Sequence, residues 1–338
     1  MKHNVKKWAA FLCVTTAIAS LLCGCGQQQQ EQETFIGPYE PDLITIFCAY
    51  GAGTGVDMQG RQTFNTMKKE GITDANFLFE NYPGASGQVG FAVATEQRAG
   101  DRDLIFVLSS TMAMLNEIQG AKYSYKDMIP IGQVADDFNA IVVPGASPFN
   151  TLEELIAGSQ EKELVGGCSG AAGVGDILIN RLKMATDLQA RVLPFEGNGA
   201  SKSAILGNHV DFAVMNFSQV MNHLDTGEMK ALAVTSSERM AAAPDVPTLM
   251  ELGIDIEQST FRGFAMLPGT PQEILDYWEG KLEEVVQTEA FQQDYCAANG
   301  LTPHFLNAED FKARLDAEYE INTQVLTQMG LAANPKEE

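Results

Sequence analysis

The sequence predicts an α/β protein built from two doubly wound domains, and three observations support this prediction. Short apolar runs typical of strands alternate with amphipathic runs typical of helices along nearly the whole chain, which favours parallel-rich sheets. The chain has 338 residues, and the 314 residues from Cys25 onward suffice for two domains of ordinary size. Apolar residues make up 45% and charged residues 20%, as in globular proteins that bury a core of their own.

The expected strands and helices follow one another in chain order. Their irregular spacing disfavours a barrel of eight equal βα units. Two Thr-x-x-Glu capping boxes, at Thr151 and Thr270, mark helix starts, and the second has Pro271 at the first helical position. Strands are expected at 43–50, 76–80, 104–108, 131–134, 140–143, 164–167, 191–193, 212–215, 231–234 and 261–267, and helices at 56–70, 87–97, 151–157, 174–185, 200–206, 271–287 and 307–328.

The charge of the chain excludes several classes of partner. The net charge is −22, and the first 24 residues hold three lysines and no acid, so the remainder carries −25. A nucleic-acid binder needs clustered Lys and Arg to neutralise phosphates, and an anionic membrane surface attracts basic patches. Neither class fits. Net charge describes the whole surface, so an anionic small ligand in one cleft remains compatible with it.

The N-terminus has the pattern of an export signal. Residues 1–7 are basic, residues 8–22 are mostly apolar, and small residues lead to Cys25, so 1–24 is predicted to be a signal peptide. The sequence Leu22-Cys-Gly-Cys25 resembles a bacterial lipobox, which implies cleavage before Cys25 and a lipid on its thiol. An ordinary secretory signal is the alternative. The polar residues 25–41 are expected to tether a lipid-anchored, extracytoplasmic protein to the cell membrane.

Three cysteines remain beyond Cys25, namely Cys48, Cys168 and Cys296. They lie far apart in sequence, and neither a Cys-x-x-Cys pair nor Cys/His spacing typical of zinc sites occurs. We therefore expect three free, mostly buried thiols and no metal or cofactor. One disulfide with one thiol left over is the alternative.

Four turns rich in Gly, Ala, Ser and Thr are the candidate binding elements. Each follows an expected strand and precedes an expected helix, and they span residues 51–57, 83–90, 166–176 and 194–201. Small residues let the backbone approach a ligand closely, and the helix that follows presents free N–H groups and a partial positive charge. Such turns lie at the carboxyl ends of strands, where open α/β sheets bind ligands. They predict a cleft between two domains for an anion or carboxylate.

Enzymatic motifs are absent from these turns. Residues 51–57 have the spacing Gly-x-Gly-x-Gly, which differs from the dinucleotide fingerprint, and the Lys of a P-loop is missing. Neither Ser86 nor Ser169 stands in a Gly-x-Ser-x-Gly elbow. We therefore expect binding and no catalysis. A structural role, in which each turn only makes a tight connection, is the alternative for any single turn.

The turns and their neighbours resemble the substrate-binding receptors of tripartite tricarboxylate transporters, also called Bug-type extracytoplasmic solute receptors. The residues 80–87 (ENYPGASG) look like the family's Glu-Asn-x-Pro-Gly-Ala-x-Gly, and Asp57 and Arg61 stand where the family has Asp and Arg. Further matches follow in family order at 194–197, 207–211, 238–239, 244–253 and 268–271. The family's usual Asp-Gly-Tyr-Thr is replaced at 100–104, and Ala52 stands where Gly is common, so the chain is identified as a divergent member.

The resemblance implies a two-domain periplasmic-binding-protein fold of type II, with a ligand cleft between two lobes. One lobe would comprise 42–143 with 262–338, and the other 144–261. It implies a small carboxylate ligand, hand-over to separate permease subunits and a monomeric receptor. The ligand-binding residues it implies are Gly51, Ala52, Gly53, Thr54, Asp57 and Ser86 in the first lobe, and Ser169, Gly170, Ala171, Gly197, Asn198 and Asn216 in the second.

Two questions stay open at this point. Asp57 and Arg61 are four residues apart on a helix, so they form either an exposed pair or a brace in which Asp57 holds the turn through backbone N–H groups. The receptor could also report its ligand to a signalling partner instead of a permease, and an enzyme on the same fold is a weaker alternative. The identity of the carboxylate is not encoded in these motifs.

Overall fold

The computed structural model describes residues 39–110 and 115–333. The described residues from Glu40 onward form one compact unit, and the description below concerns that unit. The predicted signal peptide, the predicted lipidation site Cys25 and all but the end of the predicted tether lie outside the described residues. In the described part of the chain, no helix combines the length and the apolar character that a membrane crossing needs.

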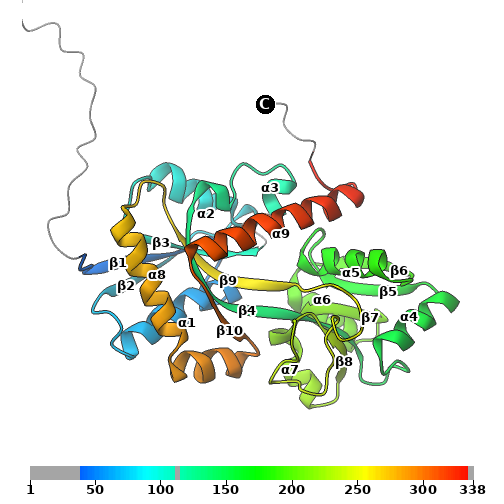
Figure 1. The fold of residues 1–338 in the computed structure, drawn as a ribbon. Helices are drawn as coiled ribbons and strands as arrows, with labels where there is room; N and C mark the ends of the chain where they lie inside the picture. The colour runs from blue at the N-terminus through cyan, green and yellow to red at the C-terminus, as the bar shows by residue number, and fades with distance from the viewer. Residues whose placement is uncertain (1–38, 111–114, 334–338) are drawn as a thin grey trace, which may run out of the picture. The chain divides into compact units, whose positions relative to one another are not determined.

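The strands form one path in the order β2-β1-β3-β9-β4-β7-β5-β6, and β8 and β10 also pair with β4. β1 is parallel to β2 and β3, and β5 is parallel to β6 and β7. The long strands β4 and β9 are antiparallel to each other and lie between these parallel strands (Figure 1). The bounds are β1 Leu43–Cys48, β2 Asn76–Asn81, β3 Leu104–Ser109, β4 Ile129–Pro144, β5 Leu164–Ser169, β6 Ala190–Phe195, β7 Phe212–Asn216, β8 Met229–Val234, β9 Ser259–Met266 and β10 Thr302–Leu306.

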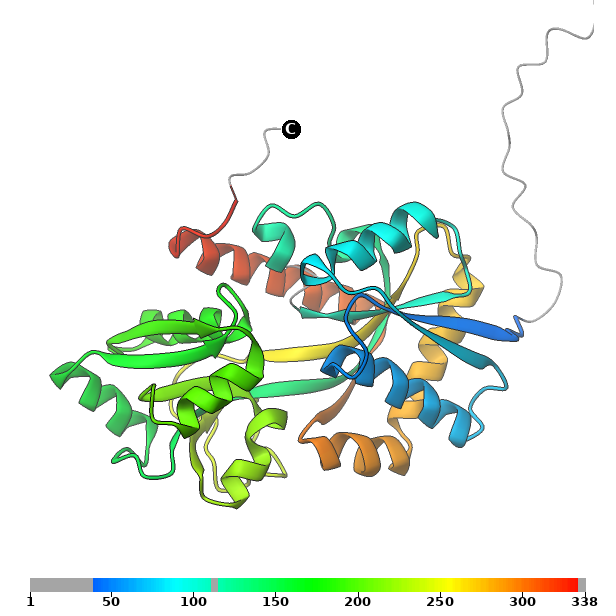
Figure 2. The ribbon, with the colours of Figure 1, turned by 180° about the vertical axis from the view of Figure 1, so that it is seen from behind.

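Strand β4 joins two groups of strands. Its first part pairs with β9 and β10, and its last part pairs with β7 and β8. We call β1, β2, β3, β9 and β10 the first strand group and β5, β6, β7 and β8 the second strand group. β4 carries the chain from the first group to the second, and the segment leading into β9 brings it back (Figure 2).

Helices cover both strand groups. In the first group, α1 packs on β1 and β3 and also contacts α8, while α9 contacts β4 and reaches α5 of the second group. In the second group, α5 and α6 pack on β5, and α7 packs on β8. The bounds are α1 Gly55–Lys69, α2 Gln88–Ala92, α3 Asn116–Ile118, α4 Leu152–Glu161, α5 Val174–Ala185, α6 Gly197–Leu206, α7 Phe217–Asp225, α8 Gln272–Val286 and α9 Ala308–Gln328, with short 3₁₀ or π turns at Ala85–Gly87, Val93–Gln97, Tyr125–Asp127, Ala290–Cys296 and Ala297–Asn299.

Local sequence explains where several helices begin. Thr54 caps α1, since its hydroxyl accepts the N–H of Asp57 at 3.3 Å, and two lysines in the last turn suit the negative end of the helix. Thr151 caps α4 as predicted and accepts the N–H of Glu154 at 3.1 Å, but the Glu154 carboxylate reaches back to the N–H of Asn150, one residue before the cap. The prediction of a second capping box, at Thr270, was wrong. Pro271 is the N-cap of α8, and the hydroxyl of Thr270 instead donates to the carbonyl of Leu267.

The apolar core explains why the strand runs pair as they do. In the first strand group, Phe106 lies between Phe47 and Phe91, with ring centroids 5.5 and 4.8 Å away. All three rings are fully buried. Two further clusters cover the faces of the second group, one beneath α4 and α5 and the other beneath α6 and α7. Burial of aromatic rings stabilises the first cluster, and burial of mostly aliphatic side chains stabilises the two clusters of the second group.

Most expected elements lie where the sequence predicts them, and the exceptions have physical reasons. The strands expected at 131–134 and 140–143 are one strand, β4. Asp136 and Asp137 interrupt its apolar pattern, but both are buried and neutralised by distant arginines. Strand β10 was not predicted, because it is short and lacks a clear apolar period. Helix α7 was also missed, although Phe217, Val220, Met221 and Leu224 follow a helical period, because it is short and follows β7 directly.

Candidate functional site

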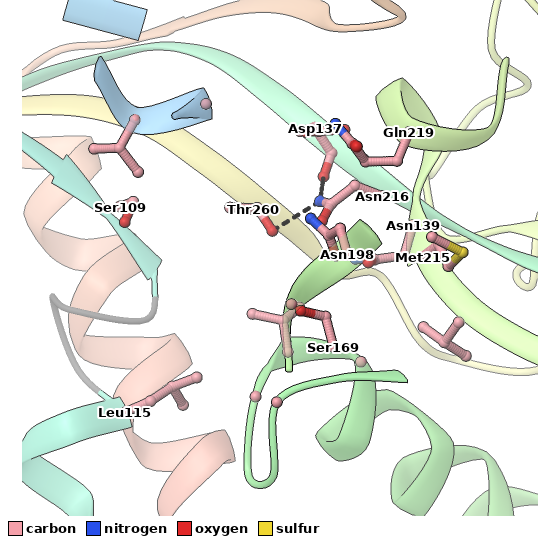
Figure 3. Close-up of a pocket in the computed structure, with 18 of the residues that line it drawn as sticks. Ser109, Leu115, Asp137, Asn139, Ser169, Asn198, Met215, Asn216, Gln219 and Thr260 are labelled. Carbon is pink, nitrogen blue, oxygen red and sulfur yellow. Dashed lines mark hydrogen bonds between the residues drawn. The ribbon is translucent and has the colours of Figure 1, made fainter. Parts of the chain in front are cut away.

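A pocket of about 530 Å³ lies where the carboxyl ends of strands from both groups meet (Figure 3). All four glycine-rich turns reach it. The first contributes Gly55 and Val56, and the second contributes Ser86. Among the residues that the structure describes, the lining comprises Tyr50, Gly55, Val56, Ser86, Ser109, Leu115, Gln119, Asp137, Asn139, Ser169, Gly170, Ala171, Ala172, Gly173, Val174, Gly175, Gly197, Asn198, Val214, Met215, Asn216, Gln219, Thr260 and Arg262.

Seven of the twelve predicted ligand-binding residues line this pocket, and the structure brings them together from four separate elements. They are Ser86, Ser169, Gly170, Ala171, Gly197, Asn198 and Asn216. The other five do not line it, although the adjacent Tyr50, Gly55 and Val56 do; the five are Gly51, Ala52, Gly53, Thr54 and Asp57. That these five contact a bound ligand stays a prediction.

The first turn is folded inward onto Asp57. The carboxylate of Asp57 accepts the N–H of Gly53 at 2.8 Å, the guanidinium of Arg61 at 2.8 Å and the amide of Asn81 at 2.9 Å. Burial opposes the ionisation of Asp57, but these three donors hold its pKa below the ordinary value. Asp57 is therefore the brace that one of the two sequence interpretations predicted, and the N–H of Gly53 is engaged within the turn.

The third turn, in the second strand group, has the same construction. Asp176 in the first turn of α5 accepts the N–H of Ala172 at 2.8 Å and the amide of Asn180 at 2.9 Å. Burial is the largest influence here and raises the pKa of Asp176. Gly170 has φ of +76°, a conformation that favours glycine, and it opens the turn so that its backbone lines the pocket.

The second turn stores backbone strain beside the pocket. Ser86 has φ of +52°, in the left-handed region that costs a non-glycine residue of order 1 kcal/mol. The hydroxyl of Tyr50 donates to the carbonyl of Ser86 at 3.2 Å and so ties the first turn to the second. Burial raises the pKa of Tyr50 to about 12, which keeps this donor protonated.

A buried ion pair lies at the crossing of β4 and β9. Arg262 on β9 donates from Nη2 to Oδ2 of Asp137 on β4 at 2.7 Å, and both residues line the pocket. Burial dominates and raises the pKa of Asp137, although Arg262 and Ser218 counteract it. The hydroxyl of Ser218 donates to Asp137 at 2.8 Å and fixes the carboxylate from α7.

Neutral polar side chains line the pocket beside this ion pair. Asn216 donates from Nδ2 to the hydroxyl of Thr260 at 3.0 Å and to the carbonyl of Asp137 at 3.3 Å (Figure 3). Among the described residues, no donor bonds the Asn216 side-chain oxygen, which can therefore accept a bond from a ligand. Asn139 and Gln219 add amide groups to the same side of the pocket (Figure 3). Such groups recognise ligands through hydrogen bonds in either direction.

Sequence reasoning missed Arg262 and Asp137. They lie inside strands and belong to no motif, and their contact joins positions 125 residues apart. A buried charge in an apolar strand is a usable signal, because such a charge needs a partner. The sequence alone does not say which partner.

The structure has a second cavity, of about 560 Å³, beside β10 and the segment that follows β8. It is lined by residues such as Ser236, Arg239, Glu257 and His304. None of the four glycine-rich turns reaches it. The candidate ligand site is therefore the first pocket.

The remaining cysteines are free and buried, as predicted. Burial raises the pKa of Cys48 to about 11 and that of Cys168 and Cys296 to about 12. The thiols are thus protonated and unreactive at neutral pH. Among the described residues, no group of three His, Cys, Asp or Glu side chains is placed to hold a metal ion.

The fold and the pocket define a solute-binding receptor of the periplasmic-binding-protein type. A solved TctC solute-binding protein from Polaromonas superposes with a TM-score of 0.75 and 26% identity, covering 86% of this chain and 99% of that one. The periplasmic binding protein BugD superposes with a TM-score of 0.70 and 21% identity, covering 88% of this chain and 100% of that one. The mixed α/β fold predicted from the sequence is confirmed.

The chain belongs to the family described as tripartite tricarboxylate transporter family receptor, which residues 61–331 match. A Cupriavidus necator relative, named UPF0065 protein in gbd 5'region, is 24% identical over 322 residues, covering 94% of this chain and 96% of the relative. Protein BugT of Bordetella pertussis is 24% identical over 272 residues, covering 78% and 82% respectively. The predicted family is confirmed, and with it a receptor rather than an enzyme.

Proposed function

We propose that this receptor binds a small carboxylate in the pocket and delivers it, as a monomer outside the cytoplasm, to the permease of a tripartite tricarboxylate transporter. The meeting of all four glycine-rich turns at one pocket carries this proposal. The turns bring the N-termini of α1, α5 and α6 to the pocket, where partial positive charge favours an anion.

The energy of binding requires these elements to act together. A helix N-terminus contributes roughly 0.3–1 kcal/mol when exposed and up to about 2 kcal/mol when partly buried. Micromolar affinity requires about 8 kcal/mol. Three helix termini therefore account for part of the affinity, and hydroxyls, amides and Arg262 supply further hydrogen bonds.

Two solved relatives support the class of ligand. A Rhodopseudomonas palustris protein solved with adipate superposes with a TM-score of 0.71 and 20% identity. MatC from the same organism, solved with malate, superposes with a TM-score of 0.66 and 17% identity. Both ligands are small carboxylates. The shared fold favours a ligand similar in size to adipate or malate. Which carboxylate binds depends on the residues that line this chain's own pocket.

The two strand groups provide the lobes of this receptor. We propose that 42–143 with 262–338 move as one lobe and 144–261 as the other, with the pocket between them. The pairing of β4 and β9 supports this division, because these strands carry the chain across and back. The lobes then close on the ligand through bending near the two crossings.

The N-terminal segment provides the anchor. We propose that 1–24 is removed, that Cys25 carries a lipid and that 25–41 tethers the receptor, on the strength of the lipobox order. In cells fed a fatty-acid analogue, the wild-type chain should be labelled and Cys25→Ser should be unlabelled. Equal labelling of the two chains contradicts the proposed lipid anchor and does not affect the proposal for the ligand site.

The binding role is tested by what the receptor carries. Protein purified from its native host without denaturation should release a small carboxylic acid, identified by mass spectrometry. In titration calorimetry with that acid, Asn198→Asp should weaken binding about tenfold, because it adds a like charge in the pocket. Asn208→Asp makes the same change at an exposed turn outside the pocket and should bind like wild type. A released molecule without a carboxyl group contradicts the proposal.

A further inference from the structure

The described lining of the pocket contains one cation, Arg262, and that cation is already paired. Of the described residues that line it, Arg262 and Asp137 are the two with charged side chains. Arg262 is 9% exposed and Asp137 is 1% exposed, and they bond at 2.7 Å. The four residues between Ser110 and Leu115, for which no placement is described, add no charged side chain in the sequence.

Arg262 keeps donors for a ligand. A guanidinium has five N–H donors, and Asp137 accepts one of them. The Nε of Arg262 has no hydrogen-bond partner among the described residues, but it is buried, so a ligand in the pocket does not reach it. The terminal nitrogens keep donors that Asp137 leaves free, and a ligand carboxylate can accept from these.

The guanidinium also lies beside the N-terminus of α1. Its two terminal nitrogens stand 3.6 and 3.7 Å from the position that a Cβ on Gly55, the first residue of α1, would occupy. A guanidinium and a helix N-terminus are both positive, so they repel each other unless an anion lies near both. This arrangement favours a carboxylate at Arg262.

The rest of the pocket suits an uncharged partner. Asn139, Asn216 and Gln219 carry amides, and Thr260 and Ser109 carry hydroxyls. A second carboxylate here would lose its hydration and face the negative charge of Asp137 without gaining a cation. The N-termini of α5 and α6 offer it roughly 0.3–2 kcal/mol each, which is less than the cost of desolvating an unpaired charge. Hydroxyl or amide groups of a ligand would instead be satisfied by these side chains.

We infer that the ligand carries a single carboxylate, which Arg262 binds, and an otherwise uncharged, hydrogen-bonding body. This inference rests on the proposed function and narrows its ligand class. Asp137 is a positioning residue in this arrangement. It is held by Ser218 on α7 and in turn holds the guanidinium, and its negative charge selects against a second anionic group.

The test compares small dicarboxylates with their monoamides. Adipate, malate and their shorter and longer homologues are each paired with the monoamide, which keeps the size and shape and removes one charge. All are screened at millimolar concentration by thermal shift, and those that stabilise the protein are titrated by calorimetry. The best monoamide should bind at least about tenfold tighter than its own diacid.

The outcomes separate the inference from the proposed function. A diacid that binds as tightly as its monoamide, or more tightly, overturns the single-carboxylate inference and leaves a carboxylate receptor. If no member of either series stabilises the protein, the proposed receptor for small carboxylates is contradicted together with the inference.

Variants test the two residues. Arg262→Gln combined with Asp137→Asn removes both charges but keeps a hydrogen-bonding pair, so the fold is protected. It should weaken binding of the best monoamide at least about tenfold. Arg191→Gln removes the same charge from an exposed position outside the pocket and should bind like wild type. Unchanged binding in the double variant overturns the role of Arg262.

Asp137→Asn alone tests selectivity. If Asp137 selects against a second anion, this variant should shift the monoamide-to-diacid affinity ratio toward the diacid by at least about threefold. A residue with a merely structural role would weaken both ligands equally. An unchanged ratio therefore overturns the selectivity assigned to Asp137.

Discussion

At the scale of single residues, the pocket depends on two aspartates that shape turns without lining it. Asp57 and Asp176 each stand in the first turn of a helix and accept the N–H of the residue four positions earlier, both at 2.8 Å. Glycine permits these turns, and the carboxylates fix them. Neither aspartate is among the pocket's lining residues.

The role of Asp57 predicts a pH-dependent contribution to stability. Its folded pKa lies below the ordinary value, so ionised Asp57 stabilises the fold at neutral pH, and this contribution is lost as the pH falls through about 4 and below. Asp57→Asn should lower the free energy of unfolding at pH 7 by about 1–2 kcal/mol. Urea unfolding at a series of pH values measures it.

The difference between Asp57→Asn and wild type should shrink on acidification. Asp74→Asn, at an exposed position beyond α1, makes the same substitution and should leave stability unchanged throughout. A difference for Asp57→Asn that is the same at pH 7 and in acid would show that the charge of Asp57 does not stabilise the turn.

The site residues that could be predicted from the sequence are those in segments of unusual amino-acid composition. Ser169, Gly170 and Gly197 belong to turns whose small residues stand out, and the structure places them in the pocket. Arg262 and Asp137 could not be found in this way. Each lies inside a strand and belongs to no motif, and their pairing is decided by the crossing of β4 and β9.

At the scale of elements, helix positions are set by close approaches as well as by caps. Gly90 in α2 packs directly on the chain after β1. A Cβ at Gly90 would lie 2.5 Å from the Cβ of Ala49 and 2.7 Å from its Cα, which no real contact allows. Because Ala49 precedes the pocket residue Tyr50, the packing of α2 also positions one wall of the site.

Gly90→Ala should therefore destabilise the fold by about 1–3 kcal/mol through overpacking. Gly280→Ala is the matched control. Gly280 is exposed within α8 and a Cβ there meets nothing within 4 Å, so alanine should stabilise by about 0.5–1 kcal/mol. Chemical denaturation of both variants provides the comparison, and equal effects would contradict the close approach of α2 to Ala49.

Most elements with strong periodicity or caps were predictable, α7 being an exception, and those set by tertiary partners were not. The predicted helix at 174–185 coincides with α5, whose apolar face is regular. The single strand β4 was split in the prediction, because Asp136 and Asp137 break its apolar run. Burial of Asp136 opposes its ionisation, but His304 and Arg314 hold its pKa below the ordinary value, so the strand continues through it.

At the scale of the whole receptor, two chain crossings between the strand groups predict hinged closure. The ligand must favour the closed form through contacts that the open form lacks. Small-angle X-ray scattering of the ligand-free receptor and of the receptor saturated with the co-purified acid should show a smaller radius of gyration when the ligand is bound. An identical radius in both states would count against closure.

The central claim is that a small carboxylate binds in the pocket where the four glycine-rich turns meet. The most direct measurement is a crystal structure of the receptor with the ligand it carries from its native host. We predict ligand density in this pocket, with a carboxylate within hydrogen-bond distance of the Arg262 guanidinium or of the turn at 169–171. Density in the second cavity, beside His304 and Arg239, with the first pocket holding water alone, would contradict the account.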